Sequence, residues 1–147
     1  MSDALVLILG VGTVAATVSH QGGERELVSA LQAGLWAEGA TEVFKAAFGR
    51  ERPVLYTEAG VGLASNADNL RSFPSGHTSV AFALATSLWL AERDLHGRPG
   101  VVGWLGVVGA AGVGVLRVAA GKHFPSDVLG GAVLGTAAAL TVHTIKF

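Results

Sequence analysis

The sequence contains no cysteine, so it can form no disulfide, no thiolate metal site and no thiol nucleophile. Charged residues are also scarce: Asp, Glu, Lys and Arg make up 14% of the 147 residues, against about 25% in an average soluble domain. The ten basic and eleven acidic residues nearly cancel, so no basic excess exists that could neutralise a nucleic-acid backbone. These shortages argue against an ordinary soluble globule and against a nucleic-acid-binding protein.

Half of the residues are hydrophobic, and long uncharged stretches alternate with polar connections. Three stretches come close to the roughly 17 to 25 residues with which a helix crosses a bilayer, namely 4–19, 99–116 and 128–145. Two further helical stretches, 27–48 and 78–91, complete the set. The alternative, a buried helical core in a soluble protein, needs more charged surface than this chain has. We therefore predict an all-α, membrane-embedded bundle of about five helices that forms one domain over residues 1–147.

Small residues recur every four positions in two of the predicted spans, a pattern that lets membrane helices pack closely. The two series are Gly106, Ala110 and Gly114, and Gly131, Gly135 and Ala139. Trp89 and Trp104 flank the 92–100 connection, where they suit either a membrane interface or the core. The first span follows Met-Ser-Asp, which lacks the basic residue of a signal peptide. Five alternating spans place the polar stretches 49–77 and 121–126 on one face.

The first cluster, residues 45–53, contains the cations Lys45, Arg50 and Arg52. Lys45 and Arg52 stand seven residues apart, about two helical turns, so both point the same way if the helix persists. Gly49 and Pro53 favour a helix end in this region. A solvated basic helix end, stabilised by the helix dipole, gives the same pattern.

The second cluster is Ser72-Phe73-Pro74-Ser75-Gly76-His77-Thr78, at the start of the apolar stretch that begins at Thr78. Ser75 and Gly76 at a helix start would leave backbone N–H groups free to bind an anion. His77 would then stand beside that anion, where it could give or take a proton. A simple helix cap also explains this pattern.

The third cluster joins the last two predicted spans and contains Arg117, His123 and Asp127. Asp127 follows His123 by four residues, close enough to accept a hydrogen bond from the imidazole and to set its tautomer. A buried structural His-Asp pair would look the same. His77, His123 and Asp127 could also form a metal site, but the surrounding Lys and Arg residues favour an anion over a cation.

Together the three clusters resemble the type 2 phosphatidic acid phosphatase family, which also includes the vanadium haloperoxidases. The resemblance rests on Lys-x6-Arg-Pro, Pro-Ser-Gly-His and Arg-x5-His-x3-Asp, in this order, between Lys45 and Asp127. It implies that His123 attacks phosphorus to form a phosphohistidine, that Asp127 orients it, and that His77 protonates the leaving oxygen. The phosphate-binding residues that it implies are Lys45, Arg52, Ser75, Gly76 and Arg117.

The resemblance implies a metal-independent enzyme without a cofactor, which hydrolyses a lipid phosphate monoester or an isoprenoid diphosphate in a bacterial inner membrane, with its site facing outward. Two features depart from the family. Leu116 stands where the family usually has Ser, which removes one hydroxyl contact to phosphate. Members commonly have about six membrane helices, so the N-terminal part is predicted to be reduced. The alternatives are a non-catalytic membrane scaffold that retains the motifs and a vanadate-dependent haloperoxidase. The oligomeric state is not predicted.

Overall fold

The computed structural model describes residues 23–58 and 66–145, and all regular structure in these two ranges is helical. Its elements, in chain order, are α2 (Gly23–Phe48), the 3₁₀ turns η1 (Pro53–Tyr56) and η4 (Ala67–Leu70), α3 (Gly76–His96), α4 (Val101–Ala119) and α5 (Pro125–Ile145). The predicted all-α bundle is confirmed. The expected span at 4–19 lies outside the described residues.

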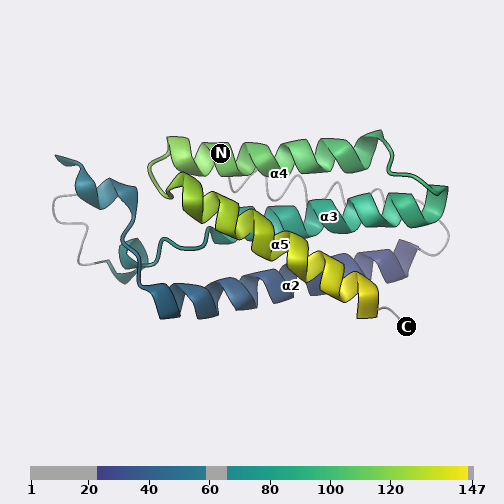
Figure 1. Ribbon diagram of the computed structural model, residues 1–147, viewed down its shortest axis with the longest axis horizontal. Coiled ribbons are helices and arrows are strands. Elements are labelled where there is room, and N and C mark those ends of the chain that lie inside the picture. Colours follow the sequence, from purple (N-terminus) through teal and green to yellow (C-terminus); the bar gives the residue numbers. More distant parts are fainter. Residues whose placement is uncertain (1–22, 59–65, 146–147) are drawn as a thin grey trace.

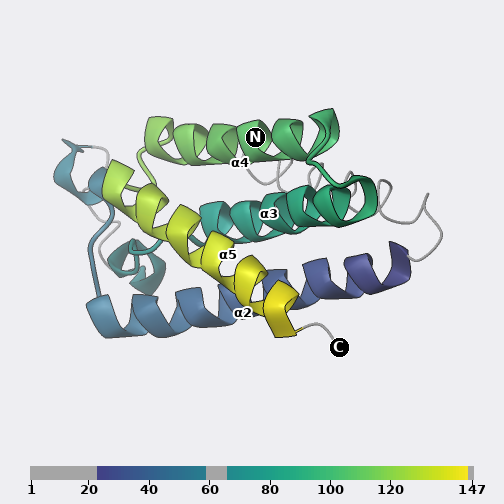
Figure 2. The same ribbon diagram turned by 45° about the vertical axis from the view of Figure 1, so that its right-hand side comes forward.

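Helix α3 lies at the centre of the bundle and packs against α2, α4 and α5. Figures 1 and 2 show α2 and α4 on opposite sides of α3, with α5 crossing it obliquely. The core is built largely from alanines, including Ala33 and Ala37 of α2, Ala81 and Ala83 of α3, and Ala110 of α4. Such small side chains let the helices approach closely.

Both predicted small-residue series are buried where helices meet. A Cβ at Gly131 would lie 2.5 Å from the carbonyl oxygen of Ser75, and a Cβ at Gly135 would collide with the carbonyl oxygen of Ser79. Only glycine therefore allows the first turns of α5 to lie directly on α3. This contact places the start of α5 beside the start of α3.

Within residues 23–58 and 66–145, two helices, α4 and α5, are long and apolar enough to cross a membrane. Only 28% of the apolar window in α4 and 17% of that in α5 is buried, whereas the core helix of a soluble protein is mostly buried. The outward faces of the bundle carry large apolar side chains, such as Leu35 and Trp36 on α2, Leu105 on α4 and Val133 on α5. This surface suits an apolar surrounding rather than water.

Helix α3 extends past its predicted end at residue 91, because a charged residue in its last turns binds the start of α4. The Glu92 carboxylate accepts hydrogen bonds from the N–H groups of Gly100 and Gly103, both 2.8 Å, at the start of α4. The helix ends at Gly97, whose φ of 72° is left-handed. Trp89 and Trp104 pack edge to face with ring centroids 6.0 Å apart.

Candidate active site

The three motif clusters meet at one end of the bundle, where α2 and α4 end and α3 and α5 begin (Figure 1). Two backbone hydrogen bonds tie the segment after α2 to the segment before α3: Arg52 N–H to the Asn69 carbonyl (2.9 Å) and Ser72 N–H to the Arg50 carbonyl (2.7 Å). A third, from Val54 N–H to the Gly121 carbonyl (3.2 Å), joins η1 to the α4–α5 connection. The described parts of the two polar stretches, 49–58, 66–77 and 121–126, thus lie together at this end of the bundle, as predicted.

Ser75 and Gly76 form the start of α3, as the sequence predicts. Ser75 is the N-cap, is fully buried, and donates its N–H to the Asp127 carbonyl at 2.9 Å. A Cβ at Gly76 would lie 3.4 Å from the Lys45 ammonium nitrogen and 3.3 Å from a Glu38 oxygen. The structure therefore brings Lys45 directly to the positive end of α3, an arrangement suited to an anion.

The imidazole of His123 is nearly fully buried in the connection between α4 and α5. Its Nδ1 lies 2.8 Å from the carbonyl oxygen of Ser72. Because a carbonyl oxygen only accepts hydrogen bonds, Nδ1 carries the proton and Nε2 keeps its lone pair. Burial, together with the cationic Arg117, lowers the pKa of His123 to about 4, so the imidazole is neutral near pH 7.

Asp127 lies beside His123 but does not make the predicted hydrogen bond to it, since Oδ2 stands 3.8 Å from Nδ1. The carboxylate is fully buried and instead accepts from the Ser72 hydroxyl (2.6 Å), the Arg50 guanidinium (2.6 Å) and the Phe124 N–H (2.8 Å). The i,i+4 spacing brings the two residues close, but the Ser72 carbonyl lies nearer to the imidazole. Asp127 therefore acts on His123 by its charge, without a hydrogen bond to it, and the two residues are linked through Ser72.

The cations expected to hold phosphate gather around this centre. Arg52 is buried, and its guanidinium pairs with Asp68 at 2.8 Å. Lys45 pairs with Glu42 at 2.8 Å. The charges of Arg117 and Arg52 both act on the His123 imidazole.

The two remaining residues of interest stand at helix ends. His77 lies in the first turn of α3 and is partly exposed. Leu116, which replaces the usual Ser, is partly buried in the last turns of α4, next to Arg117. All eight predicted site residues thus lie at the same end of the bundle.

Sequence reasoning assigned no role to Ser72, Arg50 or Asp68, although the first two lie inside the predicted clusters. Ser72 precedes the second motif by only two residues, yet no spacing rule shows that its carbonyl meets a histidine 51 positions later. Arg50 pairs with an aspartate 77 positions away. Contacts of this kind are set by how the loops cross, which local periodicity does not report.

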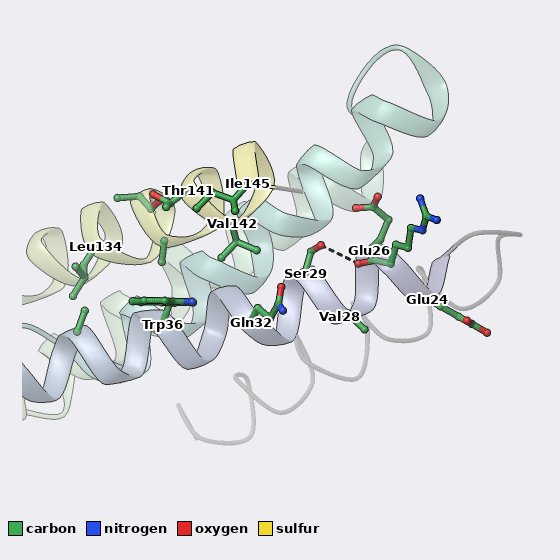
Figure 3. Close-up of a pocket in the computed structure, with 14 residues that line it drawn as sticks. Glu24, Glu26, Val28, Ser29, Gln32, Trp36, Leu134, Thr141, Val142 and Ile145 are labelled. Carbon is green, nitrogen blue, oxygen red and sulfur yellow. Dashed lines mark hydrogen bonds between the residues drawn. The ribbon is translucent and has the colours of Figure 1, made fainter. Parts of the chain in front are cut away.

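The large groove of the bundle is separate from this site. It has a volume of about 1130 Å³ and lies between α2 and α5, where Trp36 and Gln32 face Leu134 and Val142 (Figure 3). None of the eight predicted site residues lines it. Within 23–58 and 66–145, no group of three His, Cys, Asp or Glu side chains is placed to hold a metal ion.

The family model of the PAP2 superfamily matches residues 26–147, which include all three motifs. The chain belongs to the PAP2 superfamily. This confirms the resemblance to the type 2 phosphatidic acid phosphatases. The fold agrees with the crystal structure of Aquifex aeolicus LpxE, with a TM-score of 0.65 and 24% identity over 93% of this chain and 86% of that one.

Two curated relatives match this PAP2 chain in sequence. The bacitracin transport permease protein BcrC of Bacillus licheniformis is 39% identical over 71 residues, or 48% of this chain. The lipid A 1-phosphatase of Porphyromonas gingivalis is 36% identical over 97 residues, or 66% of this chain. The matched segments cover 32% and 18% of those two proteins.

Proposed function

We propose that this PAP2 chain is a membrane-bound phosphatase that hydrolyses a lipid phosphate monoester or an isoprenoid diphosphate without a metal ion. The observation that carries the proposal is His123, whose neutral imidazole is held with Nδ1 protonated and is influenced by the charges of Arg52 and Arg117. A neutral nucleophile can attack a phosphate anion when nearby positive charges stabilise the phosphate oxygens.

In the proposed reaction, His123 Nε2 attacks phosphorus and the bond from phosphorus to the lipid oxygen breaks. His77 donates a proton to that leaving oxygen, and the phosphoryl group remains on His123. A water molecule, deprotonated by His77, then attacks phosphorus and breaks the bond to Nε2, which restores the imidazole and releases phosphate. Positioned acid-base groups typically contribute about 10² to 10⁴ in rate.

The phosphoryl oxygens would be held by the cations and by the start of α3. Lys45 stands at Gly76, and Arg52 and Arg117 act on His123 from other elements. Each such oriented donor is typically worth about 10² to 10³ in kcat. On phosphate binding, the carboxylates of Asp68 and Glu42 would give up Arg52 and Lys45 to the substrate oxygens.

A lipid substrate is supported by the apolar outward faces of α2, α4 and α5 and by the relative named lipid A 1-phosphatase. We place the protein in a bacterial inner membrane with the site facing outward, as the family resemblance implies. Reaction of a single cysteine, introduced at the exposed Lys122, with an impermeant maleimide in intact cells would test this orientation.

The deciding experiment measures phosphate release by detergent-purified protein from phosphatidate, phosphatidylglycerophosphate, an isoprenoid diphosphate and lipid A. We expect turnover of at least one of these lipids and none by His123→Gln. His96→Gln, at the opposite end of the bundle, is the matched control and should stay active. Wild-type activity in His123→Gln would contradict the assignment of the nucleophile.

Leu116 in place of Ser favours one other function, a membrane scaffold that keeps the motifs without turnover. Vanadate imitates five-coordinate phosphorus and should inhibit the phosphatase at low concentration, while EDTA should leave it active. A scaffold would neither turn over lipid phosphates nor bind vanadate. Loss of activity in EDTA with recovery in Mg²⁺ would instead support a metal mechanism.

A further inference from the structure

The buried carboxylate of Asp127 is engaged by three donors, none of which is the imidazole. The Ser72 hydroxyl and the Phe124 N–H approach Oδ2 at 2.6 and 2.8 Å, and the Arg50 guanidinium approaches Oδ1 at 2.6 Å. The Nδ1–H of His123 meets a neutral carbonyl instead. The tautomer of the imidazole is thus set by a peptide group rather than by a negative charge.

We propose that Ser72 and Arg50 are positioning residues for His123, with Ser72 holding both the imidazole and Asp127 Oδ2, and Arg50 pairing with Asp127 Oδ1. This inference rests on the proposed function where it treats His123 as the nucleophile. Neither residue belongs to the three motifs that identify the family.

Ser72 contacts both groups from a single fully buried residue. Its carbonyl accepts from His123, its hydroxyl donates to Asp127, and its N–H donates to the Arg50 carbonyl at 2.7 Å. All three polar groups of Ser72 therefore make hydrogen bonds, which fix the orientation of the residue. A side chain without a hydroxyl would leave an Asp127 oxygen with one donor fewer, at 3.8 Å from Nδ1 and able to compete for its proton.

Arg50 is held by three contacts of its own. Its guanidinium pairs with Asp127, donates to the Ser126 hydroxyl at 2.8 Å and lies 4.2 Å above the centre of the Phe124 ring. A planar guanidinium suits this combination of stacking and ion pairing better than an ammonium group. Arg50 thus neutralises a carboxylate that would otherwise make the neighbouring imidazole more basic.

The charged groups that act on His123 come from several elements. Arg117 at the end of α4 and Arg52 before η1 favour the neutral imidazole, and Asp127 in the first turn of α5 favours the cation. Arg50 acts on this balance through Asp127. Its removal should therefore shift the titration of His123 upward, which a role in folding alone would not do.

The test combines ¹⁵N-histidine NMR with kinetics on the full-length protein in detergent, using Ser72→Ala, Arg50→Gln and the double variant. Arg98→Gln removes the same charge at the exposed far end of the bundle and is the control. We expect wild-type His123 to carry its proton on Nδ1 and to titrate at higher pH in Arg50→Gln. We expect kcat to fall about tenfold to a hundredfold in each single variant, the range typical of residues that orient metal ligands through hydrogen bonds, with little change in KM.

Because both side chains act through Asp127, the double variant should lose little more than the worse single variant, whereas Arg50→Gln and Arg98→Gln should combine independently. Unchanged NMR titration and kcat in folded Arg50→Gln would overturn the inference, and so would an effect confined to KM. If Ser72→Ala does not fold, the NMR titration of His123 and kcat in Arg50→Gln and Arg50→Lys still test the inference. Absence of lipid turnover in the wild type would instead defeat the proposed function, while the NMR titration would still test the positioning.

Discussion

The N–H of Ser75 donates a 2.9 Å hydrogen bond to the carbonyl of Asp127, so the second and third motifs are joined by their backbones. This bond forms because α5 lies against α3 without side chains between them at Gly131 and Gly135. The positions of Asp127 and His123 therefore depend on glycines that carry no chemistry. The geometry of the candidate site therefore depends on the packing of α5 against α3.

Gly131→Ala should reduce both stability and activity. The new methyl group would lie 2.5 Å from the Ser75 carbonyl oxygen, which forces α5 outward and strains the bond between Ser75 and Asp127. Overpacking of this kind typically costs about 1 to 3 kcal/mol in the free energy of unfolding. Thermal unfolding and kcat in detergent measure the two effects. Gly112→Ala is the control, since a Cβ there meets nothing within 4 Å, and equal behaviour of the two variants would contradict the packing argument.

His77→Ala should affect substrates according to their leaving group. An alkoxide leaving from a lipid phosphate needs a proton, so kcat/KM should fall about 10² to 10⁴-fold. A nitrophenolate needs little protonation, so kcat/KM for an aryl phosphate should fall much less. His96→Ala, at the other end of the same helix, provides the comparison. Equal losses on both substrates would remove the general-acid role.

The low pKa of His123 predicts how activity and stability depend on pH. A pKa of about 4, below the ordinary 6.5, keeps the imidazole neutral down to mildly acidic pH, so the acid limb that it causes in kcat/KM should lie near pH 4. Above pH 6.5 the residue is neutral in both folded and unfolded protein and adds no pH dependence. Between pH 6.5 and 4 only the unfolded chain binds the proton, so the free energy of unfolding should fall by up to about 3 kcal/mol as pH decreases.

Unfolding measured across this pH range in wild type and in His123→Gln isolates the contribution of this residue. The difference between the two curves should slope only below about pH 6.5. A flat difference would mean that His123 titrates alike in the folded and unfolded protein.

Leu116→Ser should raise activity and lower stability. If position 116 lies beside the phosphate, as the resemblance implies, the new hydroxyl supplies a hydrogen bond to a charged group, worth at best about 1.5 to 3 kcal/mol, and kcat/KM should rise about tenfold. The lost packing of a partly buried Leu lowers the melting temperature. Leu116→Ala loses the same packing without adding a hydroxyl and should show no gain. A flat or lower kcat/KM in folded Leu116→Ser would require a revised role for Arg117.

The helices follow from the sequence because uncharged stretches of this length have few other stable states, and Pro125 does occupy the first position of α5. The residues at which these helices end are predicted less well from the sequence. The charged residues after Ala91 suggest a loop, yet they continue α3 because Glu92 binds the N–H groups at the start of α4. A helix end depends on such partners as much as on its own residues.

The sequence by itself predicted the eight motif residues that lie at this end of the bundle, because the polar segments that carry them connect long apolar stretches. Only the tertiary structure decided which group binds which. Asp127 binds Ser72 and Arg50, and His123 binds a backbone carbonyl. These partners lie more than 50 residues away along the chain, so local spacing could not predict them. Spacing along one chain segment limits which side chains can meet. The packing of α5 on α3 decides that Nδ1 of His123 lies 2.8 Å from the Ser72 carbonyl and 3.8 Å from Asp127, and so which hydrogen bond forms.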